Sequence, residues 1–413
     1  PSGWSSVIGT YNNACALSNV GTVYCWGASV ANGQLGDGTT SARGYAKMID
    51  NTGTGFPNGT VITKIFTTSN YETSVQAQSY FAIASDGKLY SWGYNGYGQL
   101  GDGTTVTRTS PVLVGSGVLA GKTIVKVSVN SGNQTHVAAV DSTGQLYTWG
   151  RNIKGQLGLN DTTDRSNPTV VVGYTNVADV IAAGGTDSGP TNWGYTVLRK
   201  TDGTVWASGA NDQGQLGDGT TAQKNIFTRE STLKTNIASI YGGTYNTAMV
   251  DTSGNAYLTG NGSDGQLGDN GTSVRTAYYA PTGTFQGKVS RVVMGGDRYN
   301  GNVYMYILDT DGNVWSAGFG SQGQLGRGVA STGATFFQKV LRNTDGKKAV
   351  DVRVWGHSTN SGAMILNEDG TIMTTGNTYN GNDANVSNAG AQVLSFKYLA
   401  GFEPGAKGST LGA

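Results

Sequence analysis

Charged side chains are scarce in this chain. Asp, Glu, Lys and Arg make up 13% of the 413 residues, where about 25% is usual. This composition excludes coiled coils and helix bundles, which are rich in Glu and Lys. The 27 basic and 26 acidic residues nearly cancel, and no basic stripe is present, so nucleic acid is a poor candidate partner. No apolar run approaches the roughly 18 residues that cross a bilayer, so no membrane span is expected.

Residues that carry catalysis are also rare. The chain has two histidines, His136 and His357, and two cysteines. It contains no Gly-x-Ser-x-Gly, His-Glu-x-x-His or phosphate-loop motif. The segment 309–313 begins like a calcium loop but lacks the Glu at the twelfth position, so we interpret it as a hairpin turn. The sequence therefore predicts no catalytic residue, no metal site and no cofactor. A carboxylate pair assembled from distant segments is the alternative left open.

Glycine, in contrast, is abundant, at 66 residues. The tetrapeptide Gly-Gln-Leu-Gly recurs at 33–36, 98–101, 155–158, 214–217, 265–268 and 323–326. A turn glycine precedes each copy, and a seventh such turn, at Gly370, is followed by a decayed copy at 379–382. Seven units of about 59 residues therefore account for the chain. The first residue is Pro1 rather than Met, and we expect a processed form or a fragment of a longer protein.

Each unit shows an apolar period of two residues, as in 146–149 and 314–317, and Asp-Gly dipeptides separate successive runs. Four short strands repeated seven times predict an all-β fold, a seven-bladed β-propeller of four-stranded antiparallel blades. We expect a single domain over 1–413, with a C-terminal tail at 397–413. Since the first unit starts late, at 4–8, while the run 392–396 is left over, we predict that the C-terminal strand closes the ring by pairing with the N-terminal blade.

The repeat also carries a family resemblance. The segment 86–101 reads DGKLYSWGYNGYGQLG, which resembles the repeat of the regulator-of-chromosome-condensation family of seven-bladed propellers. The resemblance covers the whole chain. It implies the propeller fold and leaves function open, because that family includes nucleotide exchange factors, enzyme inhibitors and many bacterial surface proteins.

The repeat residues themselves have structural explanations. We expect the tetrapeptide glycines to adopt left-handed backbone angles or to allow close blade contact. The leucine should pack between blades, and the glutamine should bond loop backbone that would otherwise be buried without a partner. The residue before the strand-ending glycine differs between the two halves of the chain, which predicts a bulkier first half: it is Trp26, Trp92, Trp149, then Ser208, Thr259, Ala317 and Thr375.

The two cysteines flank the first hairpin symmetrically. Cys15 and Cys25 should therefore face each other on adjacent strands, at the separation that a cross-strand disulfide requires. Two free core thiols are the alternative. The run 15–27 also resembles secreted bacterial members of the family, which implies an oxidising, extracytoplasmic location.

One face of the propeller is expected to carry the binding residues. The loop that we place between the second and third strands is enlarged at 69–79, 184–194 and 295–302, and the loops that leave the Trp-Gly strand end share its face. Both sets hold residue types that anchor interfaces. The candidate binding residues are Tyr71, Tyr94, Tyr97, Arg151, Trp193, Arg298, Tyr299 and Tyr379, with Lys154 and Phe319 nearby.

Together these features predict a non-enzymatic, extracellular, cell-surface or virion module for recognition or structure, with a protein or a surface glycan as its partner. Low charge and many Thr, Ser, Asn and Gly residues are typical of such proteins. The resemblance implies one alternative, a protein-binding regulator such as a GTPase exchange factor or an enzyme inhibitor. Another is a polysaccharide-degrading enzyme with a cross-blade carboxylate site, for which the loops offer Glu72, Asp187 and Asp297. The identity of the partner and self-assembly are left open.

Overall fold

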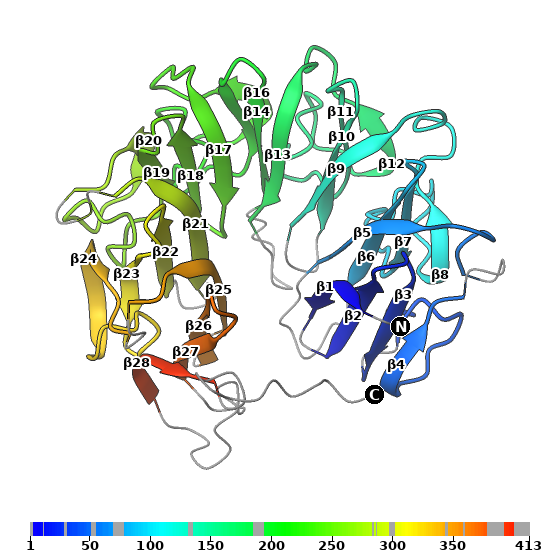
Figure 1. Ribbon diagram of the computed structural model, residues 1–413. Coiled ribbons are helices and arrows are strands. Elements are labelled where there is room, and N and C mark those ends of the chain that lie inside the picture. Colours follow the sequence, from blue (N-terminus) through cyan, green and yellow to red (C-terminus); the bar gives the residue numbers. More distant parts are fainter. Residues whose placement is uncertain are drawn as a thin grey trace. The chain divides into compact units, whose positions relative to one another are not determined.

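The period-two runs form strands, and the glycine dipeptides between them form tight turns (Figure 1). The computed structural model describes residues 3–10, 12–28, 31–50, 55–68, 78–130, 135–184, 194–282, 285, 287–296, 302–342, 346–357, 360–377 and 392–399. Two compact units are present: Pro1–Asp212 with Ala222–Thr235, and Gln213–Thr221 with Asn236–Ala413. The expectation of one domain over 1–413 stays a prediction.

The first unit holds sixteen strands in four sheets. They are β1 (Trp4–Gly9), β2 (Asn13–Ser18), β3 (Val23–Gly27), β4 (Arg43–Met48), β5 (Ile62–Thr67), β6 (Ser79–Ala84), β7 (Leu89–Gly93), β8 (Arg108–Leu113), β9 (Ile124–Val129), β10 (His136–Asp141), β11 (Leu146–Gly150), β12 (Arg165–Val170), β13 (Val177–Ala183), β14 (Tyr195–Lys200), β15 (Val205–Gly209) and β16 (Lys224–Arg229).

The second unit holds twelve strands in three sheets. They are β17 (Ile237–Gly242), β18 (Asn246–Asp251), β19 (Ala256–Gly260), β20 (Arg275–Tyr279), β21 (Val289–Gly296), β22 (Val303–Asp309), β23 (Val314–Gly320), β24 (Ser331–Lys339), β25 (Ala349–His357), β26 (Asn360–Asn367), β27 (Ile372–Asn377) and β28 (Gln392–Tyr398).

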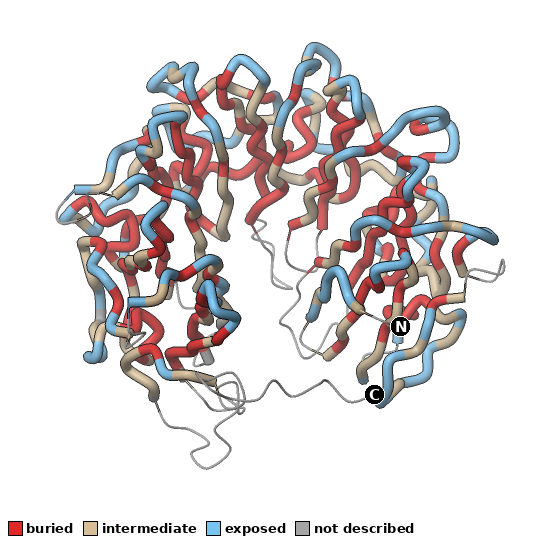
Figure 2. The backbone as a smooth tube through the Cα atoms, viewed as in Figure 1, coloured by how far each residue is buried: buried red, intermediate tan, exposed pale blue. Residues whose placement is uncertain are grey.

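All seven sheets have four antiparallel strands in sequence order, as in β5-β6-β7-β8. The predicted seven-bladed β-propeller is therefore confirmed. The second and third strands are the most buried parts of the blades: every residue of β6, β10 and β18 is buried, and so is every residue of β7 and β11 (Figure 2). The first strands β1, β5, β9 and β13 of the first unit contact one another in that order. No helix among the described residues is long and apolar enough to span a membrane.

The Gly-Gln-Leu-Gly segments form the contacts between consecutive blades, as the sequence predicts. All six glutamines are fully buried, and all six leucines are at most 3% exposed. Each glutamine Oε1 accepts the backbone N–H two residues earlier, at 2.8 to 3.0 Å. The glutamine backbone carbonyls accept bonds from the next repeat, as when the Trp92 indole donates to Gln34 at 3.1 Å and the Trp149 indole to Gln99 at 2.9 Å. No ligand is needed to explain these residues.

The last glycine of the tetrapeptide lies against an aromatic ring. A Cβ added to Gly101 would stand 2.7 Å from the Trp149 indole nitrogen, and one added to Gly268 would stand 2.3 Å from the Phe337 ring. Both glycines have positive φ, 70° and 65°. A side chain at either position would therefore clash and strain the backbone. The rings that cover these glycines are Trp92, Trp149, Phe227, Tyr278, Phe337 and Phe396.

These six rings come from two different strands, which changes the interpretation of the tryptophan pattern. Trp92 and Trp149 lie on third strands, whereas the other four rings lie on fourth strands. Where Trp92 or Trp149 on the third strand covers the glycine, the fourth strand has proline at the equivalent place, Pro111 or Pro168. Where the third strand carries Ser208 or Ala317, the fourth strand supplies the ring. The first half of the chain is therefore bulkier than the second only on its third strands. In the second half the aromatic ring lies on the fourth strand instead.

The predicted ring closure is wrong. The C-terminal strand β28 pairs with β27, through Thr374 and Lys397 among others, and completes the last blade. The N-terminal strand β1 pairs with β2, so the first blade already has four strands of its own. The run 4–8, which the sequence marks as the late start of the first unit, is itself the first strand of that blade, so no strand is missing for the C-terminus to supply.

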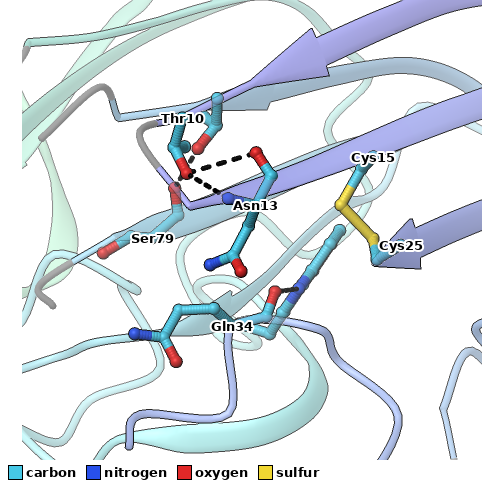
Figure 3. The surroundings of a disulfide bond; sticks show 8 residues. Thr10, Asn13, Cys15, Cys25, Gln34 and Ser79 are labelled. Atoms are coloured by element: carbon cyan, nitrogen blue, oxygen red, sulfur yellow. Dashed lines mark hydrogen bonds between the residues drawn. A yellow bond between two sulfur atoms is a disulfide. The ribbon is translucent and has the colours of Figure 1, made fainter. Parts of the chain in front are cut away.

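The predicted disulfide is present. Cys15 and Cys25 are directly opposite each other in the β2–β3 register and form a bond whose Cα atoms are 4.1 Å apart. Both sulfur-bearing residues are buried, and Figure 3 shows them beside Asn13, whose backbone bonds Thr10. The alternative of two free core thiols is excluded in this structure.

Removing this disulfide should destabilise the chain. Because the bond restricts the unfolded chain, Cys15→Ala/Cys25→Ala is expected to lower the free energy of unfolding by about 2–4 kcal/mol. Urea unfolding of the parent and the variant, each with and without reductant, measures the loss. Reductant should not change the stability of the variant. Equal stability of the oxidised parent and the variant would contradict the expectation.

Candidate functional site

The two sets of loops that the sequence assigned to one face do leave the same edge of each blade. In the second blade, β5 ends at Thr67 and β7 ends at Gly93. Thr67 pairs with Tyr80, and Gly93 pairs with the preceding Ser79. Both strand ends therefore lie at the start of β6. We call this edge of the blades of the first unit the loop edge. The enlarged loops join first and second strands rather than second and third, because each blade begins one strand later than the sequence predicts.

Five of the eight predicted binding residues lie outside the described residues. They are Tyr71, Trp193, Arg298, Tyr299 and Tyr379. The other three, Tyr94, Tyr97 and Arg151, are described, and all three belong to the loops that leave third strands at the loop edge.

These three residues form one cluster. The Arg151 guanidinium lies over the Tyr97 ring, 4.6 Å from its centroid. The rings of Tyr94 and Tyr97 meet edge to face, with centroids 6.4 Å apart. All three side chains are half-buried. Because Tyr94 and Tyr97 leave β7 while Arg151 leaves β11, the cluster bridges two blades, and the contact between Tyr97 and Arg151 is one that sequence spacing cannot indicate.

The charge of the cluster is balanced by a carboxylate that sequence reasoning missed. Asp164 bonds Arg151 Nη1 at 2.8 Å and accepts the Asn152 backbone N–H at 2.8 Å. Next to it, Lys154 lies 3.9 Å from Asp212. The arginine is therefore held in place over the tyrosine ring. The only signal in the sequence was that Asp164 is acidic and directly precedes a fourth strand, a place where other blades carry Ala42, Thr107, Gln223 and Val274.

Tyr94 also packs on its own loop. A Cβ added to Gly96 would stand 2.1 Å from the Tyr94 hydroxyl, so this glycine is required for the ring to fold down. Burial, followed by the nearby Tyr97, raises the pKa of the Tyr94 hydroxyl. Tyr94 is thus a neutral support for Tyr97, and the remaining contact groups of the cluster are Tyr97 and Arg151.

An apolar cavity of about 400 Å³ opens among the first strands of the same unit. It is lined by Ile8, Gly9, Ile65, Phe66, Thr67, Val127, Ser128 and Val129. These are the last residues of β1, β5 and β9, so the cavity lies toward the loop edge. Ile8, Phe66 and Val129 are half-buried. The edge therefore combines an apolar hollow with an aromatic and charged cluster.

The two loop positions that carry the cluster differ between repeats. The first position follows the strand-ending glycine and the second precedes the tetrapeptide. They hold Tyr94 and Tyr97 in the second blade and Arg151 and Lys154 in the third; the fourth, fifth and sixth blades have Ala210 with Gln213, Asn261 with Asp264, and Phe319 with Gln322. The strand-ending glycine before the first position and the Gly-Gln-Leu-Gly segment after the second stay the same. The fixed residues thus build the loop, and the variable ones give each blade its own surface.

No group of three or more His, Cys, Asp or Glu residues that could hold a metal ion occurs in the described part of the chain. His136 is fully buried, and its Nε2 lies 3.0 Å from Thr196 Oγ1. Burial lowers the pKa of His136 to about 3. This histidine is therefore a neutral core residue without access to a substrate.

Comparison with known proteins identifies the repeat. Residues 86–139, 143–188 and 202–250 match the model of the "Regulator of chromosome condensation (RCC1) repeat". The matched segments cover less than half of the chain. The first two contain Tyr94, Tyr97, Arg151 and Asp164, so the cluster lies within segments that match this repeat.

Relatives of these repeats occur in large ligases. The chain is 32% identical over 209 residues to "Probable E3 ubiquitin-protein ligase HERC4" of Homo sapiens, covering 49% of this chain and 18% of that protein. It is 31% identical over 270 residues to human "E3 ubiquitin-protein ligase HERC2", covering 65% of this chain and 5% of that protein. The chain thus spans under a fifth of the length of these relatives. They are eukaryotic, so the expected likeness to secreted bacterial members is not borne out.

Solved structures share the fold. Prp20p from Saccharomyces cerevisiae superimposes with a TM-score of 0.63 at 18% identity, covering 84% of this chain and 80% of that chain. Human WBSCR16 gives a TM-score of 0.62 at 19% identity, covering 84% and 83%. At this identity the likeness concerns the RCC1-type propeller alone.

Proposed function

We propose that this chain is a non-enzymatic, protein-binding RCC1-type propeller, closer to a protein-binding regulator than to a structural surface module. The observation that carries the proposal is the Tyr97–Arg151 cluster, built at loop positions that vary between the constant strand-ending glycine and the constant Gly-Gln-Leu-Gly segment. Tyr and Arg are enriched at the centres of protein interfaces. The apolar hollow at the same edge supplies a place for an apolar side chain of the partner.

A protein partner fits this edge better than a glycan. Arg151 is bonded to Asp164 and covers one face of Tyr97, so that face of the ring is not open for sugar stacking. Prp20p, which shares the fold, has binding properties to Gsp1p and histones, and this supports a protein partner here. Ligase chemistry is not part of the proposal, because the chain matches only a small part of the HERC ligases.

The proposal predicts a large loss of affinity when the cluster is removed. Tyr97→Ala/Arg151→Ala is expected to weaken binding about 30-fold, the effect of losing a hot spot of roughly 2 kcal/mol. The partner is first captured from extracts of the source cells with the intact chain and identified by mass spectrometry. Its dissociation constant is then measured for both proteins by calorimetry.

Tyr45→Ala provides the matched control. Tyr45 lies on β4 and is 68% exposed, outside the loop edge, so its removal should leave affinity unchanged. Far-ultraviolet circular dichroism and urea unfolding show whether each variant is folded. Equal affinities of the parent and the cluster variant, both folded, would contradict the proposal.

A GTPase exchange factor is the specific regulator that the family resemblance implies. The fold shared with Prp20p favours testing it. This activity conflicts with the extracytoplasmic location proposed below, because small GTPases are cytosolic or nuclear. If the chain is an exchange factor, release of a fluorescent guanine nucleotide from purified small GTPases is faster in its presence. If the chain accelerates nucleotide release from none of a panel of such GTPases, exchange activity is excluded. The protein-binding proposal is unaffected by that result.

We further propose that the chain functions in an oxidising, extracytoplasmic compartment. The buried Cys15–Cys25 bond supports this, because disulfides persist in such compartments. Alkylation of thiols in unbroken source cells, before lysis, tests the location. Two alkylated cysteines in the chain would overturn it.

A further inference from the structure

One position inside the blades repeats with changing charge. Each first strand has a β-bulge near its start, and the residue after the bulge takes the same place in every blade. A bulge redirects the side chain that follows it. The residues at this position are Ser6, Lys64, Lys126 and Asp179 in the first unit and Ser239, Arg291 and Asp351 in the second.

Neighbouring blades form ion pairs through this position. In the first unit, Lys126 on β9 bonds Asp179 on β13. In the second unit, Arg291 on β21 bonds Asp351 on β25. In both pairs a cation of one blade meets the carboxylate at the equivalent place of the next. The post-bulge position is therefore one where consecutive blades bring opposite charges together.

The pair formed by the second and third blades breaks this pattern. Lys64 occupies the position on β5, and its neighbour at the equivalent place is Lys126 rather than a carboxylate. Lys64 is exposed and forms no ion pair with any described residue. The second and third blades thus bring two lysines together at this position, whereas the two ion pairs described above each combine a cation with an aspartate. Like charges at short range repel.

Arg199 adds a third cation to the same place. It lies on β14 directly opposite Asp179 in the strand register. Its buried Nε has no hydrogen-bond partner among the described residues, although buried donors are normally satisfied. Lys126 and Arg199 therefore both lie beside Asp179, and the charge of Lys64 acts on Lys126. Burial, then the charges of Arg199 and Lys64, lower the pKa of the Lys126 ammonium to about 8.

We propose that Lys64, Lys126 and Arg199 form a receptor for a carboxylate, supplied by an acidic side chain of the protein partner. The inference rests on the proposed function for the source of that carboxylate. A carboxylate bound between Lys64 and Lys126 would supply the negative charge that Asp179 and Asp351 supply in the other charged pairs of blades. The site is accessible, since the Lys126 side chain is 41% exposed. It extends the contact surface beyond the loop edge to the start of the first strands.

The test uses hexaglutamate as the probe and the full chain at low salt. Hexaglutamate should bind, and the pKa of Lys126, followed by NMR of its side-chain Cε, should rise toward 10.5, the ordinary value. Lys64→Glu places a carboxylate beside Lys126 within the chain. This variant should raise the pKa of Lys126 without any peptide and weaken hexaglutamate binding at least tenfold.

Lys288→Glu is the matched control, with the same change of charge at an exposed lysine of the second unit. It should weaken binding less than twofold, and uncharged hexaglutamine should not bind. Urea unfolding should show Lys64→Glu to be at least as stable as the parent, because its new carboxylate faces Lys126.

The inference is overturned if hexaglutamate leaves the pKa of Lys126 unchanged, or if Lys288→Glu weakens binding as much as Lys64→Glu. Because the probe is a synthetic peptide, these results do not depend on whether the Tyr97–Arg151 cluster binds the native partner. Failure of the proposed function and failure of this site are thus seen in separate experiments.

Discussion

Phe337→Ala is expected to lower the free energy of unfolding by about 3–5 kcal/mol, the usual cost of removing a fully buried phenylalanine. Phe337 on β24 has no exposed surface and lies directly against Gly268. It packs with Leu267, Ala317 and Phe285 in one apolar cluster. Because Gly268 has no side chain that could fill the space, the alanine leaves a cavity. Urea unfolding followed by tryptophan fluorescence measures the loss.

A second substitution tests whether the aromatic ring can move between strands. Ala317→Trp/Phe337→Pro rebuilds in the sixth blade the arrangement of Trp92 and Pro111 in the second. The double variant should recover roughly half of the loss, because the new indole can cover Gly268 and a proline is tolerated on a fourth strand. A double variant less stable than Phe337→Ala would contradict the exchange. A loss below about 1 kcal/mol for Phe337→Ala itself would contradict its role in the core.

Acid is expected to destabilise the chain through His136. Its pKa is about 3 in the folded chain but about 6.5 when unfolded. Below about pH 6.5 the unfolded state therefore binds a proton that the folded state does not. The free energy of unfolding should fall by about 1.4 kcal/mol for each unit by which the pH decreases between about 6.5 and 3. Above about pH 6.5 the stabilisation from neutral His136 is fully present. Urea midpoints measured from pH 7 to 4 report the slope.

The comparison that isolates this effect uses His136→Gln, which removes the titrating group and keeps a polar side chain near Thr196. Its stability should depend much less on pH between about 6.5 and 4.5. Carboxylates such as Asp369, whose pKa is lowered to about 2 chiefly by its bond to Lys347, contribute to the loss of stability only at lower pH, and they do so equally in the parent and the variant. Equal slopes for the parent and His136→Gln would refute the prediction.

Much of the fold could be predicted from spacing alone. The strand alternation, the Asp-Gly turns and the six tetrapeptides depend on local backbone geometry, which a repeat of about 59 residues displays directly. The Cys15–Cys25 bond was predictable for the same reason, since the hairpin turn between them sets the register. The roles of the glutamines and leucines followed because each acts within or next to its own loop.

The candidate site was predicted only in part. The sequence pointed to Tyr94, Tyr97 and Arg151 as separate interface residues, and its remaining candidates lie outside the described residues. It did not pair Tyr97 with Arg151 or find Asp164, because the ring and the guanidinium are on different blades, 54 positions apart in sequence.

The sequence by itself determined the repeat, the four strands of each blade, the turns, the disulfide and the constant inter-blade residues, because each depends on contacts within about one repeat. The tertiary structure decided that β28 completes the last blade, that Phe337 replaces the ring that Trp92 supplies elsewhere, and that Lys64 meets Lys126. These features depend on which residues of successive blades face each other. That pairing is set by sheet packing and by β-bulges, which leave no periodic mark in the chain.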